Sequence, residues 1–202
     1  MILIKGTWSS SVHFRLHQMP GMTDPVNPSS RTLIIMGVSG CGKSLIGSML
    51  AEALGGKFDD GDDFHPPANK AKMSARIPLT DEDRWPWLQI LRERIVEMRA
   101  QTPWHVLACS ALKRAYREVL RGEDSTGKLQ FVYLRGSKEL IASRLNARKG
   151  HFFQPALLDS QFAALEEPGA GEAIVVDISG TPEEIAQSVV KALGQERVAA
   201  PR

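Results

Sequence analysis

The sequence predicts a doubly wound α/β fold on a five-stranded parallel sheet. Five short apolar runs alternate with longer segments in which apolar residues recur at helical spacing, a pattern typical of strands and helices wound around one sheet. The runs are continuous, as in strands buried on both faces. The chain has 202 residues, of which 43 % are hydrophobic and 24 % charged, and this is the size and composition of one globular domain.

The first strand and helix carry the strongest signals. Leu33–Met36 is a continuous apolar run that ends at Gly37, and a glycine-rich loop follows it. The helix predicted over 44–54 has an apolar stripe at helical spacing, and the glycine pair at 55–56 provides its C-terminal cap. The folded part of the chain is therefore expected to begin with a strand, a loop and a helix.

The second unit is more polar. A short strand over 57–60 leads into an acidic turn over 59–63, and a proline-rich bend precedes a short helix over 68–73. Thr80 is the expected N-cap of a long helix that ends near Gln101. The acidic residues that follow Thr80 support this start, because negative side chains stabilise the positive end of the helix dipole.

The remaining elements alternate in the same way. Strands are predicted over 106–109, 129–134 and 173–176, and helices over 112–121, 138–148, 156–165 and 181–193. Thr181, Pro182 and Glu184 form the start signal of the last helix. We expect one domain over 31–194, between a disordered extension at 1–30 and a tail at 195–202.

Charge and cysteine content exclude several classes of protein. The net charge of +2 is small and evenly distributed, which argues against a nucleic-acid-binding surface. No run approaches the roughly 18 apolar residues that a membrane span needs. Cys41 and Cys109 are too few and too far apart for a disulfide framework or a zinc site, which favours a reducing, cytoplasmic compartment.

One motif carries chemistry at the end of the first strand. Residues 37–44 match G-x-x-x-x-G-K-[ST], the nucleotide-binding phosphate loop, and lie between a buried strand and a helix as that loop requires. Backbone N–H groups bind phosphate there, Lys43 reaches the β- and γ-phosphates, and Ser44 offers its hydroxyl to Mg²⁺. The predicted nucleotide site comprises Gly37, Val38, Ser39, Gly40, Cys41, Gly42, Lys43 and Ser44.

This pattern alone does not distinguish a kinase from an ATPase or a GTPase. Asn69–Lys72 begins like the guanine-binding N-K-x-D motif but has Lys in place of Asp, which argues against a GTPase. The third strand ends without an acidic residue, so the metal's carboxylate is expected from the acidic turn after the second strand. Residues two apart on an extended strand point the same way, so both Asp60 and Asp62 can face the phosphate pocket, with Asp60 as the candidate for the Mg²⁺ shell.

Further short blocks follow one another along the chain from about Thr32 to Leu193. They are Asp60–Asp62, His65–Pro66, Asn69, Lys72–Met73, Pro78–Leu79, Asp83–Arg84, Pro86–Leu88, Cys109–Lys113, Tyr116–Arg117, Arg144, Arg148–Phe152, Ser160–Phe162 and Val176–Ile178. In type and order these blocks resemble the gluconate kinases, small P-loop carbohydrate kinases related to shikimate kinase. Arg76 departs from the pattern, which usually has Gly there.

The resemblance implies ATP-dependent phosphorylation of D-gluconate at its 6-hydroxyl, with Mg²⁺, by a homodimer of the nucleoside-monophosphate-kinase and shikimate-kinase fold type. Gluconate is a polyhydroxylated anion, so its site needs cations for the carboxylate and acceptors for the hydroxyls. The expected acceptor-site residues are Asp62, His65, Lys72, Arg84, Ser110, Lys113, Arg117 and His151.

A mobile lid over ATP is expected at about 146–156. Arg144 and Arg148 lie four residues apart on one helical face. Arginines on a closing lid neutralise charge on the transferring phosphoryl group and exclude water. We therefore expect Arg144 to bind the nucleotide and Arg148 to be catalytic together with Lys43 and Asp62.

Two other functions stay open. A shikimate-type or nucleoside-monophosphate kinase would share the fold and the donor site but bind a different acceptor. A non-catalytic nucleotide-binding protein would keep the phosphate loop and lose the acceptor-site acids, whereas this chain has both Asp60 and Asp62.

Overall fold

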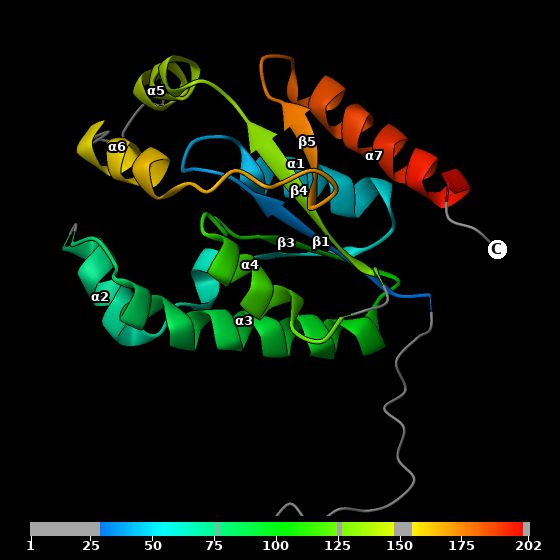
Figure 1. Ribbon diagram of the computed structural model, residues 1–202, viewed down its shortest axis with the longest axis horizontal. Coiled ribbons are helices and arrows are strands. Elements are labelled where there is room, and N and C mark those ends of the chain that lie inside the picture. Colours follow the sequence, from blue (N-terminus) through cyan, green and yellow to red (C-terminus); the bar gives the residue numbers. More distant parts are fainter. Residues whose placement is uncertain (1–28, 76, 125–126, 148–154, 200–202) are drawn as a thin grey trace, which may run out of the picture.

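The structure, a computed structural model, describes residues 29–75, 77–124, 127–147 and 155–199. Five strands form one parallel sheet in the order β2-β3-β1-β4-β5 (Figure 1). They are β1 (Arg31–Met36), β2 (Lys57–Asp60), β3 (Trp104–Ala108), β4 (Leu129–Arg135) and β5 (Ala173–Asp177). The predicted fold class is confirmed, and each strand lies within two residues of its predicted position.

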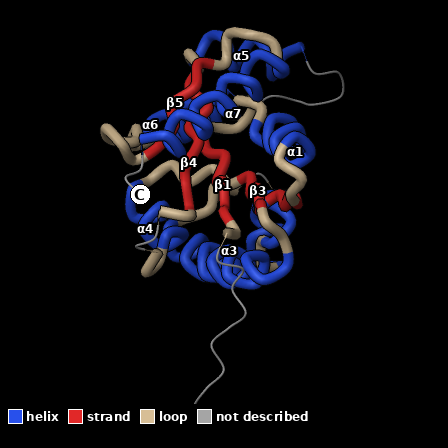
Figure 2. The backbone as a smooth tube through the Cα atoms, turned by 90° about the vertical axis from the view of Figure 1, so that its right-hand side faces the viewer, coloured by secondary structure: helices blue, strands red, loops and turns tan. Residues whose placement is uncertain are grey.

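Helices cover both faces of the sheet, as Figures 1 and 2 show. They are α1 (Lys43–Ala53), α2 (Pro67–Ser74), α3 (Asp81–Gln101), α4 (Arg114–Arg121), α5 (Lys138–Ala147), α6 (Pro155–Ala164) and α7 (Pro182–Ala199), with a short 3-10 helix η1 (Gly61–Phe64) after β2. No helix in these described ranges is both long and apolar enough to cross a bilayer.

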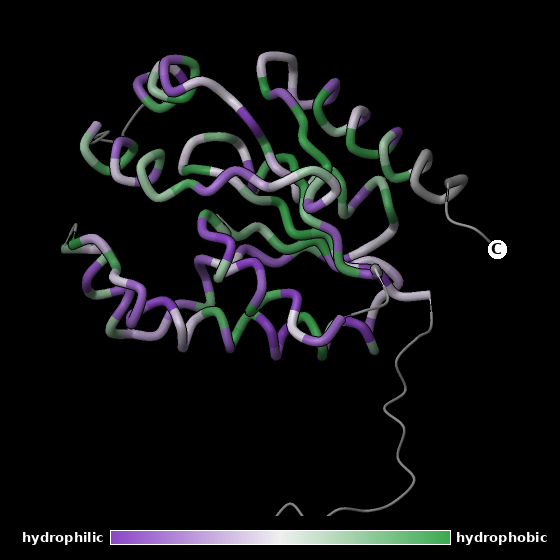
Figure 3. The backbone as a smooth tube through the Cα atoms, in the orientation of Figure 1, coloured by the Kyte–Doolittle hydropathy of each residue, from purple (hydrophilic) through white to green (hydrophobic). Residues whose placement is uncertain are grey.

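The core consists of two layers separated by the sheet. Leu33 and Ile35 of β1 pack with residues of α1, α5, α6 and α7, whereas Ile34 and Met36 pack on the other face with α3 and α4. All four side chains are fully buried, which explains why β1 is a continuous apolar run. Figure 3 shows the same concentration of hydrophobic residues in the central strands.

The topology determines where a ligand can bind. In the sheet, β2 and β3 lie on one side of β1, and β4 and β5 lie on its other side. The strand order therefore reverses at β1, which lies between β3 and β4. Ligands of open parallel sheets bind at the carboxyl ends of the strands where the order reverses. The loop after β1 is at this point.

Two helix ends bear on the sequence predictions. The capping box at the start of α3 is present: the Thr80 side chain accepts from the Asp83 backbone N–H, and the Asp83 carboxylate accepts from that of Thr80. At the other terminus, α7 continues to Ala199. The last helix therefore extends past its predicted end near Leu193, because the helical backbone continues to Ala199. The extension predicted at 1–30 lies outside the described residues except for Ser29 and Ser30.

Candidate active site

The phosphate loop has the backbone geometry that its glycines allow. Gly37, Gly40 and Gly42 have φ values of 137°, 87° and 105°, a region that other residues rarely adopt. A Cβ at Gly40 would lie 2.7 Å from the Leu145 side chain of α5, so the loop also has no space for one. The first-turn amides of α1 point into this loop and have no partner within the helix, which makes the loop an anion-binding site.

Lys43 and Ser44 lie at the N-terminus of α1, the end expected to bind phosphate and metal. Lys43 Nζ donates to the Val38 carbonyl at 3.2 Å, which holds the ammonium over the loop. Ser44 Oγ donates to Asp60 Oδ2 at 2.5 Å. This contact joins the phosphate loop to the end of β2, as predicted from the parallel sheet.

Cys41 lies inside the loop but has no chemical role in this geometry. Its side chain is buried, and desolvation raises the pKa of the thiol above its ordinary value. Because the thiolate is the reactive form, Cys41 serves as a small packing residue.

Asp62 is brought to the phosphate loop by a different local structure from the one expected. The prediction placed it on an extended strand end, but it lies in η1, where its backbone N–H donates to Asp60 Oδ1 at 3.1 Å. The 3-10 turn is held by Trp87 of α3, whose Nε1 donates to the Gly61 carbonyl at 2.8 Å. Desolvation raises the pKa of Asp62, and the charge of Lys43 opposes that rise. Asp60 is therefore the N-cap of η1 and Asp62 lies within this 3-10 turn, and both residues are next to the phosphate loop.

A cavity of about 500 Å³ opens beside the phosphate loop. Its wall includes Ser39 and Lys43 from the loop and Asp62 from η1. The other lining residues are His65, Met73, Ile77, Pro78, Leu79, Asp81, Arg84, Trp87, Ser110, Leu112, Lys113, Tyr116, Leu157, Ser160, Gln161 and Ala164. Of the predicted acceptor residues, the structure thus brings Asp62, His65, Arg84, Ser110 and Lys113 together.

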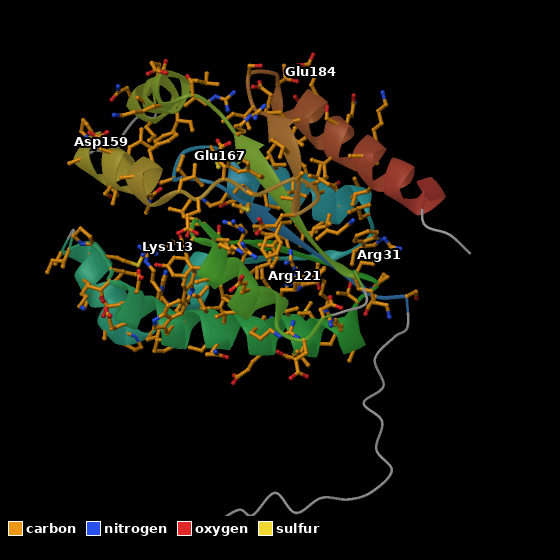
Figure 4. The ribbon with its side chains drawn as sticks, viewed as in Figure 1. Arg31, Lys113, Arg121, Asp159, Glu167 and Glu184 are labelled. Atoms are coloured by element: carbon orange, nitrogen blue, oxygen red, sulfur yellow. The ribbon has the colours of Figure 1, made fainter. Side chains whose placement is uncertain are left out.

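The cations of this cavity differ in how far they are already neutralised. Lys113 Nζ donates to both carboxylate oxygens of Asp81, at 2.8 and 2.7 Å (Lys113 is labelled in Figure 4). The bonds from Lys113 and Tyr116 lower the pKa of Asp81, so that carboxylate stays ionised. Arg84 lies over the ring of Tyr116 and has no ion-pair partner in the described part of the chain. Arg84 is therefore better able than Lys113 to receive an anionic ligand.

His65 is a buried, neutral member of the site. It stacks on Trp87 with ring centroids 4.2 Å apart, and its Nδ1 accepts from the Asn69 side-chain amide at 3.3 Å. Desolvation, with the charges of Arg84 and Lys70, lowers the pKa of His65 to about 4. Near pH 7 the ring offers its Nε2 hydrogen as a neutral donor.

Two predicted acceptor residues are not among those that line the cavity. Lys72 donates to both oxygens of the Asp83 carboxylate, at 2.6 and 2.7 Å, and lowers the pKa of that group. Arg117 is 1 % exposed, and its guanidinium bonds Glu172 and the carbonyls of Ala111, Leu112 and Glu166. The structure thus places Arg117 in the core, between α4 and the segment before β5.

The predicted lid residues are described only in part. Arg144 Nη2 donates to the Ile178 carbonyl, and its charge acts on Cys41 of the phosphate loop. Arg148 and His151, with most of the predicted lid at 146–156, lie outside the described residues.

Several cavity residues were missed by the sequence prediction. Asp81 was interpreted only as a helix-dipole residue, and its pairing with Lys113 needs a contact across 32 positions. Tyr116 and Gln161 belong to blocks that resemble the gluconate kinases, and that was the only signal available for them.

Ser44 and Asp60 fit a magnesium ion. Mg²⁺ prefers oxygen ligands, usually one or two carboxylates with phosphate oxygens and waters. The Ser44 hydroxyl and the Asp60 carboxylate, which are hydrogen-bonded beside the phosphate loop, are oxygen ligands of this kind. The described residues contain no group of three or more His, Cys, Asp or Glu side chains that could hold a metal ion.

Comparison with known proteins agrees with this geometry. Residues 39–194 match the family model described as shikimate kinase. The thermoresistant gluconokinase of Escherichia coli is 43 % identical over 169 residues, which are 83 % of this chain and 95 % of that protein. The gluconokinase of Gluconobacter oxydans is 48 % identical over 145 residues, 72 % of this chain and 80 % of that protein.

A solved structure extends the agreement to three dimensions. The gluconokinase of Sinorhizobium meliloti superposes with a TM-score of 0.75 at 44 % identity, covering 82 % of this chain and 92 % of that one. The residues that match the family model, 39–194, include the acidic turn and the residues that line the cavity. This chain therefore belongs to the gluconokinase family of P-loop kinases, within the shikimate kinase superfamily.

Proposed function

We propose that this chain transfers the γ-phosphoryl group of ATP to the 6-hydroxyl of D-gluconate, giving 6-phospho-D-gluconate and ADP. The observation that carries the proposal is the cavity, which is lined by the acid Asp62 together with the cations Lys43, Arg84 and Lys113. A polyhydroxylated carboxylate needs both a hydroxyl acceptor and a cation, and the cavity supplies both. Family membership narrows the acceptor to gluconate.

In this proposal the phosphate loop and Lys43 hold the phosphates, while Asp62 orients the acceptor. Phosphoryl transfer forms a bond from the 6-hydroxyl oxygen to the γ-phosphorus and breaks the bond to the bridging oxygen of ADP. Such a transfer depends mainly on positioning and on neutralising charge. Asp62 accepts the hydrogen of the 6-hydroxyl and so orients its oxygen toward the γ-phosphorus.

Arg84 binds the substrate carboxylate in this scheme. Its guanidinium can donate two parallel hydrogen bonds to a carboxylate and has no ion-pair partner among the described residues. Two further side chains donate hydrogen bonds to the substrate hydroxyls: Lys113, which is held by Asp81, and the neutral His65. Ser110 adds a hydroxyl from the loop after β3.

Ser44 and Asp60 would hold Mg²⁺ with the nucleotide. The ion neutralises phosphate charge when it is bound. Arg144 binds the nucleotide, and Arg148 and His151 act from a lid in this proposal. The protein works as a cytoplasmic homodimer, and its two free, buried cysteines agree with a reducing compartment.

The test is ADP release measured with a panel of acceptors. We expect turnover with gluconate and none with shikimate or with nucleoside monophosphates. Lys43→Ala serves as the donor-site control and should lower turnover with gluconate more than tenfold. Turnover with shikimate or a nucleoside monophosphate in place of gluconate would overturn the acceptor assignment, and no turnover with any acceptor would overturn the catalytic role.

A further inference from the structure

One hydrogen bond connects the phosphate loop to a helix far along the chain. The backbone N–H of Ser39 donates to the side-chain oxygen of Gln161 on α6 at 2.6 Å, across 122 positions. Because the donor is a backbone N–H, the Gln161 amide must present its oxygen. A phosphate-loop amide therefore has a neutral side-chain acceptor.

The Ser39 amide lies at the end of the loop that faces the acceptor. Ser39 and Lys43 line the cavity together with Asp62, and Gln161 lines it from α6. The transferring γ-phosphoryl group has to lie between the loop and the acceptor hydroxyl. We therefore expect the Ser39 N–H to face the γ-phosphate rather than the α-phosphate.

Gln161 is held in place independently of this bond. Leu158 on the same helix is buried in the core, and Asp159 forms an ion pair with Lys138 of α5 at 2.9 Å. Figure 4 labels Asp159 on α6. The Gln161 side chain therefore reaches the loop from a helix with its own anchors, so its loss need not displace α6.

We propose that Gln161 competes with the γ-phosphoryl group for the Ser39 N–H: its side-chain oxygen accepts this hydrogen bond and gives it up when ATP binds. The inference rests on the proposed ATP site but not on the identity of the acceptor. A single N–H makes one strong hydrogen bond at a time, and a charged phosphate oxygen is a stronger acceptor than a neutral amide oxygen. ADP lacks the γ-phosphate and leaves the Ser39–Gln161 bond intact.

The test compares a non-hydrolysable ATP analogue with ADP by calorimetry. Gln161→Met keeps the length of the side chain and removes the acceptor. Because the analogue no longer has to displace a hydrogen bond, we expect it to bind about 3- to 10-fold more tightly, with ADP affinity unchanged. Gln161→Glu keeps the acceptor and adds a charge, so we expect the analogue to bind at least about tenfold more weakly, with ADP within about twofold of the original protein.

Asp159→Asn is the matched control on the same helix, because it removes an α6 contact that does not touch the phosphate loop. We expect it to leave the analogue-to-ADP affinity ratio unchanged. The proposal is overturned if Gln161→Met leaves this ratio unchanged, if both Gln161 variants shift analogue and ADP equally, or if Asp159→Asn shifts the ratio as Gln161→Met does. None of these binding measurements uses gluconate, so failure of the acceptor assignment would be seen separately in the turnover panel.

Discussion

The donor and acceptor halves of the cavity are built in opposite ways. The donor half comes from eight consecutive residues, 37–44, and consists largely of backbone N–H groups held by glycine conformations. The acceptor half comes from side chains on η1, α3 and the segment before α4. A phosphate site can therefore be encoded locally, whereas an acceptor site depends on tertiary packing.

The two halves also differ in how their charges are balanced. Lys43 of the donor half contacts a backbone carbonyl, so its charge is available to phosphate. Lys113 of the acceptor half is paired with Asp81. Specificity in the acceptor half is therefore expected to depend chiefly on Arg84, which has no ion-pair partner among the described residues, and on Asp62, whose Oδ1 lies 3.8 Å from Nε2 of the neutral His65.

The largest effect is expected from Asp62→Asn. The amide cannot accept the proton of the acceptor hydroxyl, so turnover should fall about 1000-fold, or about 4 kcal/mol in the activation free energy. ATP affinity should stay within about threefold of the original value, since the phosphate loop is intact. Turnover and nucleotide titration of the same preparation measure both quantities.

Asp63→Asn is the matched control for that experiment. Asp63 is exposed on the same 3-10 turn and does not line the cavity. Normal turnover in Asp62→Asn, or an equal loss in both variants, would contradict the assigned role of Asp62.

The second effect tests whether Arg117 belongs to the acceptor half or to the core. Arg117→Met would leave Glu172 and three carbonyls without their donor, and we expect the free energy of unfolding to fall by about 3 kcal/mol. Arg114→Met, which removes an exposed pair with Glu118, should change it by less than about 0.5 kcal/mol. Urea denaturation measures both. If Arg117→Met left the free energy of unfolding unchanged and raised the KM for gluconate, Arg117 would be a residue of the acceptor site.

The different origins of the two halves explain what the sequence could predict. The phosphate loop, the five strands and the Thr80 cap depend on neighbouring residues, and the patterns there predicted them correctly. Arg117 and Lys72 are basic residues near the right elements, but their carboxylate partners lie 55 and 11 positions away. From the residue type alone, a basic side chain that forms an ion pair within the protein cannot be distinguished from one that is free to bind a ligand.

The third prediction uses the pH dependence of stability. His65 has a pKa of about 4 in the folded state, below its ordinary 6.5, so the unfolded chain binds a proton between these values that the folded chain excludes. The stabilisation is complete above pH 6.5 and decreases as the pH falls toward 4. Relaxation around the charged ring reduces the full effect, and we expect about 2 kcal/mol.

His65→Phe keeps the stacking on Trp87 and removes the titration. Unfolding free energies from pH 8 to 4.5 should fall less steeply in the variant than in the original protein. The carboxylates Asp81 and Asp83 have lowered pKa values and titrate below this window. Parallel curves for the two proteins would show that His65 is not held neutral by its site.

The smallest effect is expected in the donor half, from weakening the pair that would hold magnesium. Ser44→Ala and Asp60→Asn each leave one oxygen of the pair in place, so turnover should fall about tenfold at low Mg²⁺, or about 1.4 kcal/mol. Raised Mg²⁺ should restore Asp60→Asn to within about twofold, because mass action compensates for weaker binding. Ser48→Ala, one turn further along α1 and exposed, is the control without an expected effect. If raised Mg²⁺ restored turnover in Asp62→Asn and not in Asp60→Asn, the roles of the two acids would be exchanged. The metal would then lie on the acceptor side of the cavity.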